Sequence, residues 1–156
     1  MAIYRISKYD PKKRVNGAYI INEWTEYSDI GKNFFDGILT EDNYLRVEKK
    51  YINCVLSILQ YLHIDNLIIK KLEKYDTVLW KESQQLNEKD FTMILEDCLR
   101  NRCWCELHHE KTVIDFGYDY YIHIKCAICN DDIKKICEAF SLFVEKLGEP
   151  ANQTNY

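Results

Sequence analysis

The stretch that decides the fold is CWCELHHEKTVIDFGYDYYIHIKC, residues 103–126, which contains three short runs rich in aromatic and β-branched residues. The runs are CWCELHH (103–109), TVIDF (112–116) and YDYYIHIKC (118–126), and little more than a His-Glu-Lys turn and Gly117 joins them. Such composition favours strands, and short connections favour neighbouring strands that run in opposite directions. We therefore predict a three-stranded antiparallel meander.

The side chains of this meander alternate between a buried and a wet face, as the period of a strand requires. In the last run one face carries Tyr120, Ile122, Ile124 and Cys126. The other face carries Tyr121, His123 and Lys125. In the first run, by the same alternation, the inward face is predicted to carry Cys103, Cys105 and Leu107.

Three helices are predicted around the meander, because apolar residues recur there at steps of three and four. The first covers residues 41–62, with Thr40 as N-cap and two acids behind it. The second follows the N-cap Asn87. The third is capped by Asn130 and ends at Gly148 and Pro150, and its apolar stripe is Ile133, Ile136, Cys137, Phe140, Val144 and Leu147.

The remaining segments are assigned from turn residues and local composition. Residues 2–9 are predicted to form a strand, the pair Asn16-Gly17 a turn, and residues 18–21 a short strand. Residues 22–39 show no period and are expected to form a long ordered loop with at most a short helical turn, and residues 67–75 are expected to form a strand. This order predicts an α+β fold with a mostly antiparallel sheet packed on one face by about three helices. We expect one domain, residues 1–150, and a frayed tail, residues 151–156.

Length and composition are those of an ordinary globular domain. The chain has 156 residues, of which 47% are apolar and 29% charged, and its formal net charge is −4. It lacks the run of about 18 apolar residues that a membrane span needs, and its start has no basic flank leading into an apolar stretch. The seven cysteines are an odd set that suits reduced thiols. We therefore expect a cytoplasmic protein without membrane contact.

The negative charge is concentrated in one segment. Residues 22–45 contain six acids and one base, and they also carry the large aromatic residues Trp24, Tyr27, Phe34 and Phe35. Aromatic residues among carboxylates are typical of a protein-binding surface for a basic partner. A plainer interpretation is that Trp24 and Phe35 pack into the core and the rest is a solvated loop.

Two constellations of residues suggest chemistry instead of binding. The pairs Cys103-x-Cys105 and Cys126-x-x-Cys129 have a spacing that four-thiolate zinc sites use, although a strand would place the first pair in the core. The side chain of His123, on the wet face, could form an acid–base pair with Asp119 or Glu106. The sequence has no glycine-rich phosphate loop and no strained nucleophile turn, which disfavours a nucleotide-binding enzyme. The basic run at residues 12–14 is too short to predict nucleic-acid binding.

Four segments carry a resemblance to a known group: RISKYDPKKR (5–14), EWTEYSDIG (23–31), LTEDNYLRVEKKYI (39–52) and FGYDYYIHI (116–124). Together they resemble small bacterial cytosolic proteins that are similar to the immunity proteins of polymorphic or contact-dependent toxin systems. The resemblance implies a protein that has no reaction of its own and that binds and blocks a toxin domain, often a nuclease. Immunity interfaces diverge with their toxins, so the resemblance assigns no residue.

The expected function is therefore immunity by occlusion of a basic toxin surface, with no enzyme activity, no cofactor, no metal, and no direct contact with nucleic acid. Glu23, Glu26 and Asp29 are expected to meet basic residues of the toxin. Trp24 and Tyr27 are expected to form the centre of the interface, and Tyr118 and Tyr121 to extend it. The alternatives are a small hydrolase or nuclease-like enzyme based on His123 and a zinc-stabilised interaction module.

Overall fold

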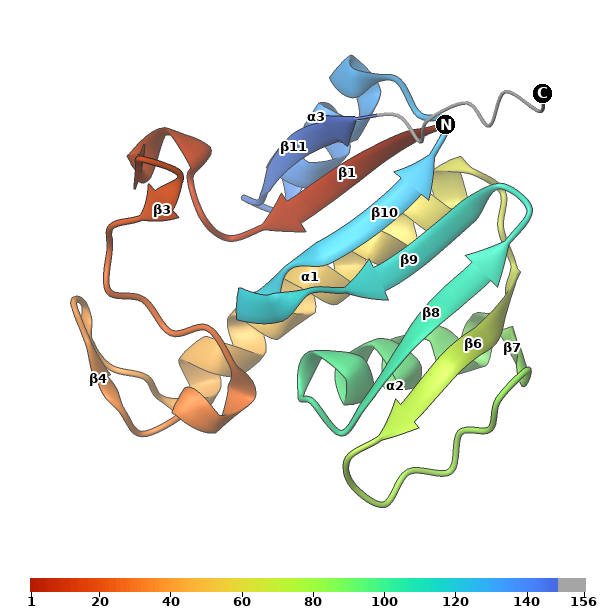
Figure 1. The fold of residues 1–156 in the computed structure, drawn as a ribbon, viewed down its shortest axis with the longest axis horizontal. Helices are drawn as coiled ribbons and strands as arrows, with labels where there is room; N and C mark the ends of the chain where they lie inside the picture. Colours follow the sequence, from red (N-terminus) through yellow and green to blue (C-terminus); the bar gives the residue numbers. More distant parts are fainter. Residues whose placement is uncertain (149–156) are drawn as a thin grey trace.

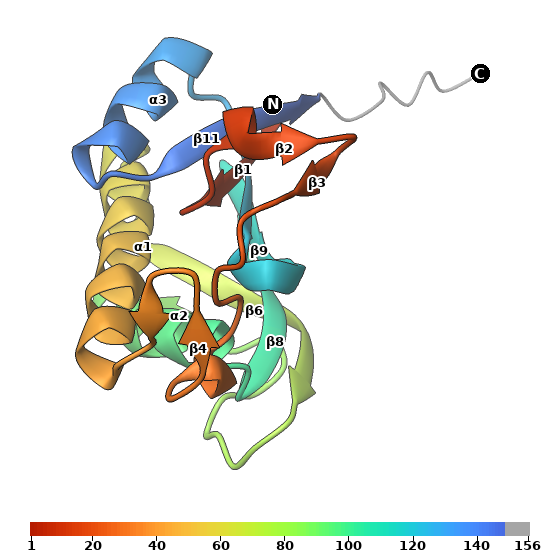
Figure 2. The same ribbon diagram turned by 90° about the vertical axis from the view of Figure 1, so that its left-hand side faces the viewer.

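The structure is a computed structural model that describes residues 1–148. A seven-stranded antiparallel sheet has the strand order β11-β1-β10-β9-β8-β6-β7, and three helices lie on one of its faces (Figures 1 and 2). This arrangement confirms the predicted α+β fold. The tail predicted to fray, residues 151–156, and the last two residues of the predicted domain lie outside the described residues.

The elements have the following bounds. The helices are α1 (Glu41–Tyr61), α2 (Glu88–Leu99) and α3 (Asn130–Ala139). The strands of the large sheet are β1 (Ala2–Ser7), β6 (Asn66–Lys74), β7 (Gln85–Asn87), β8 (Cys103–His109), β9 (Thr112–Phe116), β10 (Ile122–Cys126) and β11 (Phe143–Gly148). Two small hairpins precede α1, and their strands are β2 (Arg14–Val15), β3 (Ala18–Tyr19), β4 (Asn33–Phe34) and β5 (Gly37–Ile38).

The predicted meander is confirmed and forms the centre of the sheet. Leu107 of β8 lies opposite Ile114 of β9, which in turn lies opposite Ile124 of β10, and all three side chains are fully buried. Cys103 and Cys105 are buried on the same face, as the alternation predicts. Each fully buried aliphatic side chain contributes roughly 1.5 to 3 kcal/mol. The helices cover this face, and the opposite face of the meander carries half-buried side chains, most of them polar.

Capping residues start the first two helices where the sequence predicts. The Thr40 hydroxyl accepts a hydrogen bond from the Asn43 amide at 3.1 Å. The Asn87 and Asp90 side chains form a reciprocal capping box at the start of α2. Within the described residues, no helix combines the length and the apolar character that a bilayer span needs.

The prediction for the third helix is wrong at both ends. Cys129, not Asn130, is its N-cap, and the helix stops at Ala139 because Ser141 adopts a left-handed backbone, with φ of 57°. Residues 143–148 form β11 instead, which pairs with the free edge of β1. Val144 lies opposite Ile6 and Glu145 opposite Arg5, so Val144 and Leu147 belong to a strand and not to the helical stripe.

Two further elements differ from the prediction. The run 118–126 is a strand only from Ile122, because Asp119 and Tyr120 are both left-handed, with φ of 59° and 65°. Residues 85–87 add an edge strand to the sheet where a loop was predicted. Residues 22–39 are ordered and contain a short helical turn at Tyr27–Asp29, as predicted, but they also form the β4–β5 hairpin, which was not predicted.

Candidate functional site

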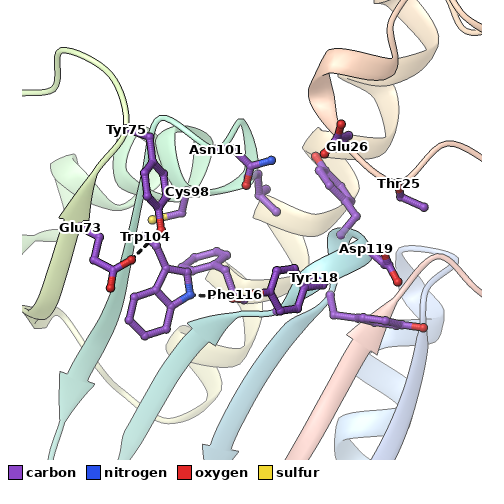
Figure 3. Close-up of a pocket in the computed structure, with 14 residues that line it drawn as sticks. Thr25, Glu26, Glu73, Tyr75, Cys98, Asn101, Trp104, Phe116, Tyr118 and Asp119 are labelled. Carbon is purple, nitrogen blue, oxygen red and sulfur yellow. Dashed lines mark hydrogen bonds between the residues drawn. The ribbon is translucent and has the colours of Figure 1, made fainter.

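A pocket of about 610 Å³ opens at one end of the sheet, where β8 and β9 meet the end of α2 and the turn that leads into β10 (Figure 3). Thr25 and Glu26, from the segment that precedes α1, complete its wall. Six aromatic side chains line the pocket: Tyr75, Trp104, Phe116, Tyr118, Tyr120 and Tyr121. Its size and aromatic lining are those of a ligand-binding site.

Trp104 lies on the wet face of β8, because its neighbours Cys103 and Cys105 point into the core. Its indole Nε1 donates a hydrogen bond of 2.7 Å to the carbonyl oxygen of Phe116 at the end of β9. On the neighbouring wall the Tyr75 hydroxyl donates to the Glu73 carboxylate at 2.6 Å, which raises the pKa of Tyr75 above its ordinary value. Glu73 is therefore held in place beside the indole (Figure 3).

The turn at residues 117–121 forms another wall of the pocket. Its two consecutive left-handed residues, Asp119 and Tyr120, each carry a backbone strain of about 1 kcal/mol or more. Gly117 permits the turn to approach β10, because a Cβ there would lie 2.7 Å from the His123 ring. The strained turn buries Tyr120 and leaves Tyr118 and Asp119 exposed.

Tyr120 is held by a buried aromatic cluster beneath the pocket, which consists of Trp24, Tyr27, Tyr44, Tyr51 and Tyr120. The Tyr120 hydroxyl donates to the Tyr44 hydroxyl at 2.9 Å. Tyr44 donates in turn to the buried Glu48 carboxylate at 2.6 Å. This chain of contacts fixes the turn on helix α1.

The charged side chains that line the pocket are all acidic. Glu26, Glu73 and Asp119 line it, and no lysine, arginine or histidine is among its lining residues. Asp119 is exposed and makes no hydrogen bond or ion pair with any of the described residues. Aromatic faces combined with unneutralised carboxylates attract cations.

Three of the residues predicted to bind a partner lie at this pocket. Glu26 and Tyr118 are exposed, and Tyr121 is half-buried. Trp24 does not lie at the pocket. Its side chain is only 7% exposed, and its ring packs against Tyr44 and Tyr120. The prediction of Trp24 as a surface anchor is wrong, and the plainer interpretation is confirmed for this residue. The plainer interpretation also predicted that Phe35 packs into the core. That prediction is wrong, because Phe35 is 63% exposed.

The other predicted residues are occupied by contacts within the chain. Tyr27 packs on Tyr44 beneath the Arg100 guanidinium, and Asp29 is buried and accepts a hydrogen bond from the Thr25 amide at 2.9 Å. Backbone amides and Lys32 offset the desolvation of Asp29 and lower its carboxyl pKa. Asp29 is therefore not exposed to a partner as predicted, whereas Tyr27 is half-buried and its predicted role in binding stays a prediction. Glu23 is half-buried, faces a separate depression and accepts from the Tyr19 hydroxyl at 2.5 Å.

The ammonium group of Lys8 packs against two residues of this segment, Trp24 and Glu23. Its Nζ lies 4.3 Å from the Trp24 ring centroid and 3.6 Å from the Glu23 carboxylate, and within residues 1–148 it has no hydrogen-bond partner. Burial lowers the pKa of Lys8 from its ordinary 10.5 to about 8, although Glu23 opposes the shift. The folded protein therefore holds this proton less tightly than the unfolded chain does.

Burying the charged Lys8 ammonium costs free energy of folding. Comparison of the Lys8→Met variant with the wild type should therefore give a stability difference that depends on pH. Below pH 8 both states are protonated and the cost of burying the charge is fully present, whereas between pH 8 and 10.5 the unfolded chain binds more protons and the wild type gains stability. We expect the stability difference between Lys8→Met and wild type to narrow by up to about 3 kcal/mol across that interval. Urea unfolding of both proteins at several pH values measures it. A difference that stays constant would contradict the assignment.

His123 has a carboxylate partner, but neither of the two that the sequence suggested. Its Nδ1 lies 2.9 Å from the Asp115 Oδ1, directly across the β9–β10 pairing. Glu106 instead contacts His108 at 2.9 Å. Both members of the His123–Asp115 pair are partly exposed, so the pair has the geometry of an acid–base dyad as well as that of a cross-strand ion pair.

The cysteines do not assemble as the zinc alternative requires. Cys98 contacts both Cys103 and Cys105, with sulfur–sulfur distances of 3.8 and 3.7 Å, and Cys129 is exposed. Across residues 1–148 no group of three or more histidine, cysteine, aspartate or glutamate side chains is placed to hold a metal ion. All seven cysteines lie in this range and are free.

Glu73, Tyr75 and Trp104 line the pocket although they were not predicted from the sequence. One signal was present: the alternation that buries Cys103 and Cys105 places an indole on the wet face between them, and large aromatic side chains there mark interaction sites. Glu73 and Tyr75 had no such signal, because only the pairing of β6 with β8 brings them beside Trp104. Comparisons with protein-family models, with curated proteins and with solved structures found no match to this chain.

Proposed function

We propose that this chain is an immunity protein, which binds a cognate secreted toxin domain in the cytoplasm and neutralises it by covering a basic surface. The observation that carries the proposal is the pocket at the end of the sheet, with three carboxylates, six aromatic rings and no base among its lining residues. The resemblance of four sequence segments to immunity proteins supports the same function. The proposal gives the chain no reaction of its own.

A nuclease is the favoured class of toxin. Enzymes that cleave nucleic acid carry basic surfaces for the phosphate backbone. An acidic surface that binds those basic residues excludes the nucleic-acid substrate and also accelerates association with the toxin. Glu26, Tyr118 and Tyr121 keep the interface role that the sequence suggested, and Glu73, Trp104 and Asp119 join them.

The test is co-expression with a toxin domain encoded by a gene that neighbours this one. We expect the toxin domain alone to arrest growth and co-expression of this protein to restore growth. We also expect the purified pair to form a stable complex whose association slows as salt is raised. The absence of both rescue and complex formation would contradict the proposal.

The same assay separates immunity from the second candidate, an acid–base enzyme that uses His123 and Asp115, 2.9 Å apart. His123→Ala should leave rescue unchanged if protection is by binding. An enzyme that destroys the toxin or its product would lose protection in this variant and would protect at less than one molecule per toxin. Titration of the two proteins in vitro measures that ratio.

A further inference from the structure

We propose that the pocket is a receptor for one arginine side chain, which projects from the toxin and whose guanidinium group lies between the aromatic walls. This inference rests on the proposed function and names the chemistry that its interface would recognise. It is carried by the charge of the pocket, the arrangement of its aromatic side chains and the state of its carboxylates.

The charge selects a cation. Glu26, Glu73 and Asp119 approach the pocket from three separate segments of the chain, and no basic side chain of the lining neutralises them. Two arginines elsewhere on the molecule are engaged by other acids: Arg102 pairs with Asp97, and Arg14 pairs with Glu145. Within residues 1–148 the three carboxylates of the pocket therefore have no ion-pair partner.

The aromatic walls select a planar cation. Figure 3 shows Trp104 and Tyr75 on one side, beside Glu73, and Tyr118 nearer to Asp119 and Glu26 on the other. A guanidinium stacks on aromatic faces and donates to two carboxylates in its own plane, whereas a lysine ammonium is a compact, strongly hydrated charge that gains less from stacking. The pocket thus favours arginine over lysine.

The three carboxylates of the pocket differ in how their side chains are oriented by hydrogen bonds within the chain. Glu73 is oriented by the hydrogen bond of 2.6 Å from Tyr75, and Glu26 by one of 2.6 Å from the Ser28 hydroxyl. Asp119 has no such partner among residues 1–148, and it lies exposed in the strained turn. Asp119 is therefore the carboxylate with most to gain from a bound cation.

The first experiment uses a small probe and does not need the toxin. N-acetyl-arginine amide should bind with a Kd of about 1 mM and perturb the NMR signals of the Trp104 indole and of residues 117–121. The lysine counterpart should bind several-fold more weakly, and the neutral citrulline counterpart at least tenfold more weakly. Equal binding of arginine and citrulline, or perturbation confined to other surfaces, would overturn the proposal.

The second experiment uses variants that keep the shape of the pocket. Glu73→Gln with Asp119→Asn should weaken binding of the arginine probe, and of the toxin, at least tenfold. The control pair Glu110→Gln with Glu138→Gln removes the same charge from exposed positions outside the pocket and should change either affinity less than twofold. Melting curves should show that both pairs remain folded.

The two proposals fail separately. If the wild type binds the toxin and the pocket variant binds it equally well, the immunity function stands and the arginine receptor is refuted. If the wild type binds no toxin while the arginine probe still binds in the pocket and discriminates against citrulline, the proposed immunity function fails and the receptor chemistry stands.

Discussion

Replacing Trp24 with alanine is expected to destabilise the fold by about 3 to 5 kcal/mol, because it removes a large buried ring from the aromatic cluster beneath the pocket. The ring is 7% exposed and lies 4.9 Å from the Tyr120 ring and 5.2 Å from the Tyr44 ring. Its loss leaves a cavity that these neighbours fill only partly. In a chain of this size the melting temperature should fall by roughly 10 °C, measured by circular dichroism.

The matched control is Tyr118→Ala. This side chain is also aromatic and adjoins the same turn, but it is 93% exposed. Its removal should change stability by no more than about 0.5 kcal/mol while weakening any complex that uses the pocket. If instead Trp24→Ala kept wild-type stability and lost partner binding, Trp24 would be an interface residue as its sequence context suggested, and the buried position described above would be wrong.

Replacing Arg100 with methionine should cost about 3 kcal/mol or more, because it leaves the buried Glu48 carboxylate without its counter-ion. Arg100 Nε and Nη2 donate to the two Glu48 oxygens at 2.9 and 2.8 Å, and Glu48 is 3% exposed. This pair holds α1 against the end of α2. The urea midpoint should fall by about 1 to 2 M, at both low and high salt, because a buried pair is weakly screened.

A double variant identifies the cause of this loss. Glu48→Gln combined with Arg100→Met removes both charges and should recover at least half of the stability that Arg100→Met loses. Single and double variants that lose equal stability would show that the packing of the Arg100 stem, which also covers the Tyr27 ring, matters more than its charge.

Local signals explain why much of the fold was predictable. Thr40 and Asn87 cap their helices through contacts that span only three residues, so the sequence contains the whole interaction. The alternation in residues 103–109 and 122–126 depends only on the geometry of a strand. The third helix failed for the opposite reason. A stripe spaced for a helix runs through residues 140–147, but pairing with β1, more than 130 residues away, outweighed it.

The candidate site was predictable only in part, for the same physical reason. The sequence by itself determined that carboxylates and aromatic rings are concentrated ahead of the long helix and around residues 116–121, and this composition is what attracts a cation. It did not determine which of these side chains face water. Tertiary packing decided that: the buried Tyr120 ring packs against Trp24, Tyr44 and Tyr51 in the core. The pairing of β6 with β8 brings Glu73 and Tyr75 to the pocket.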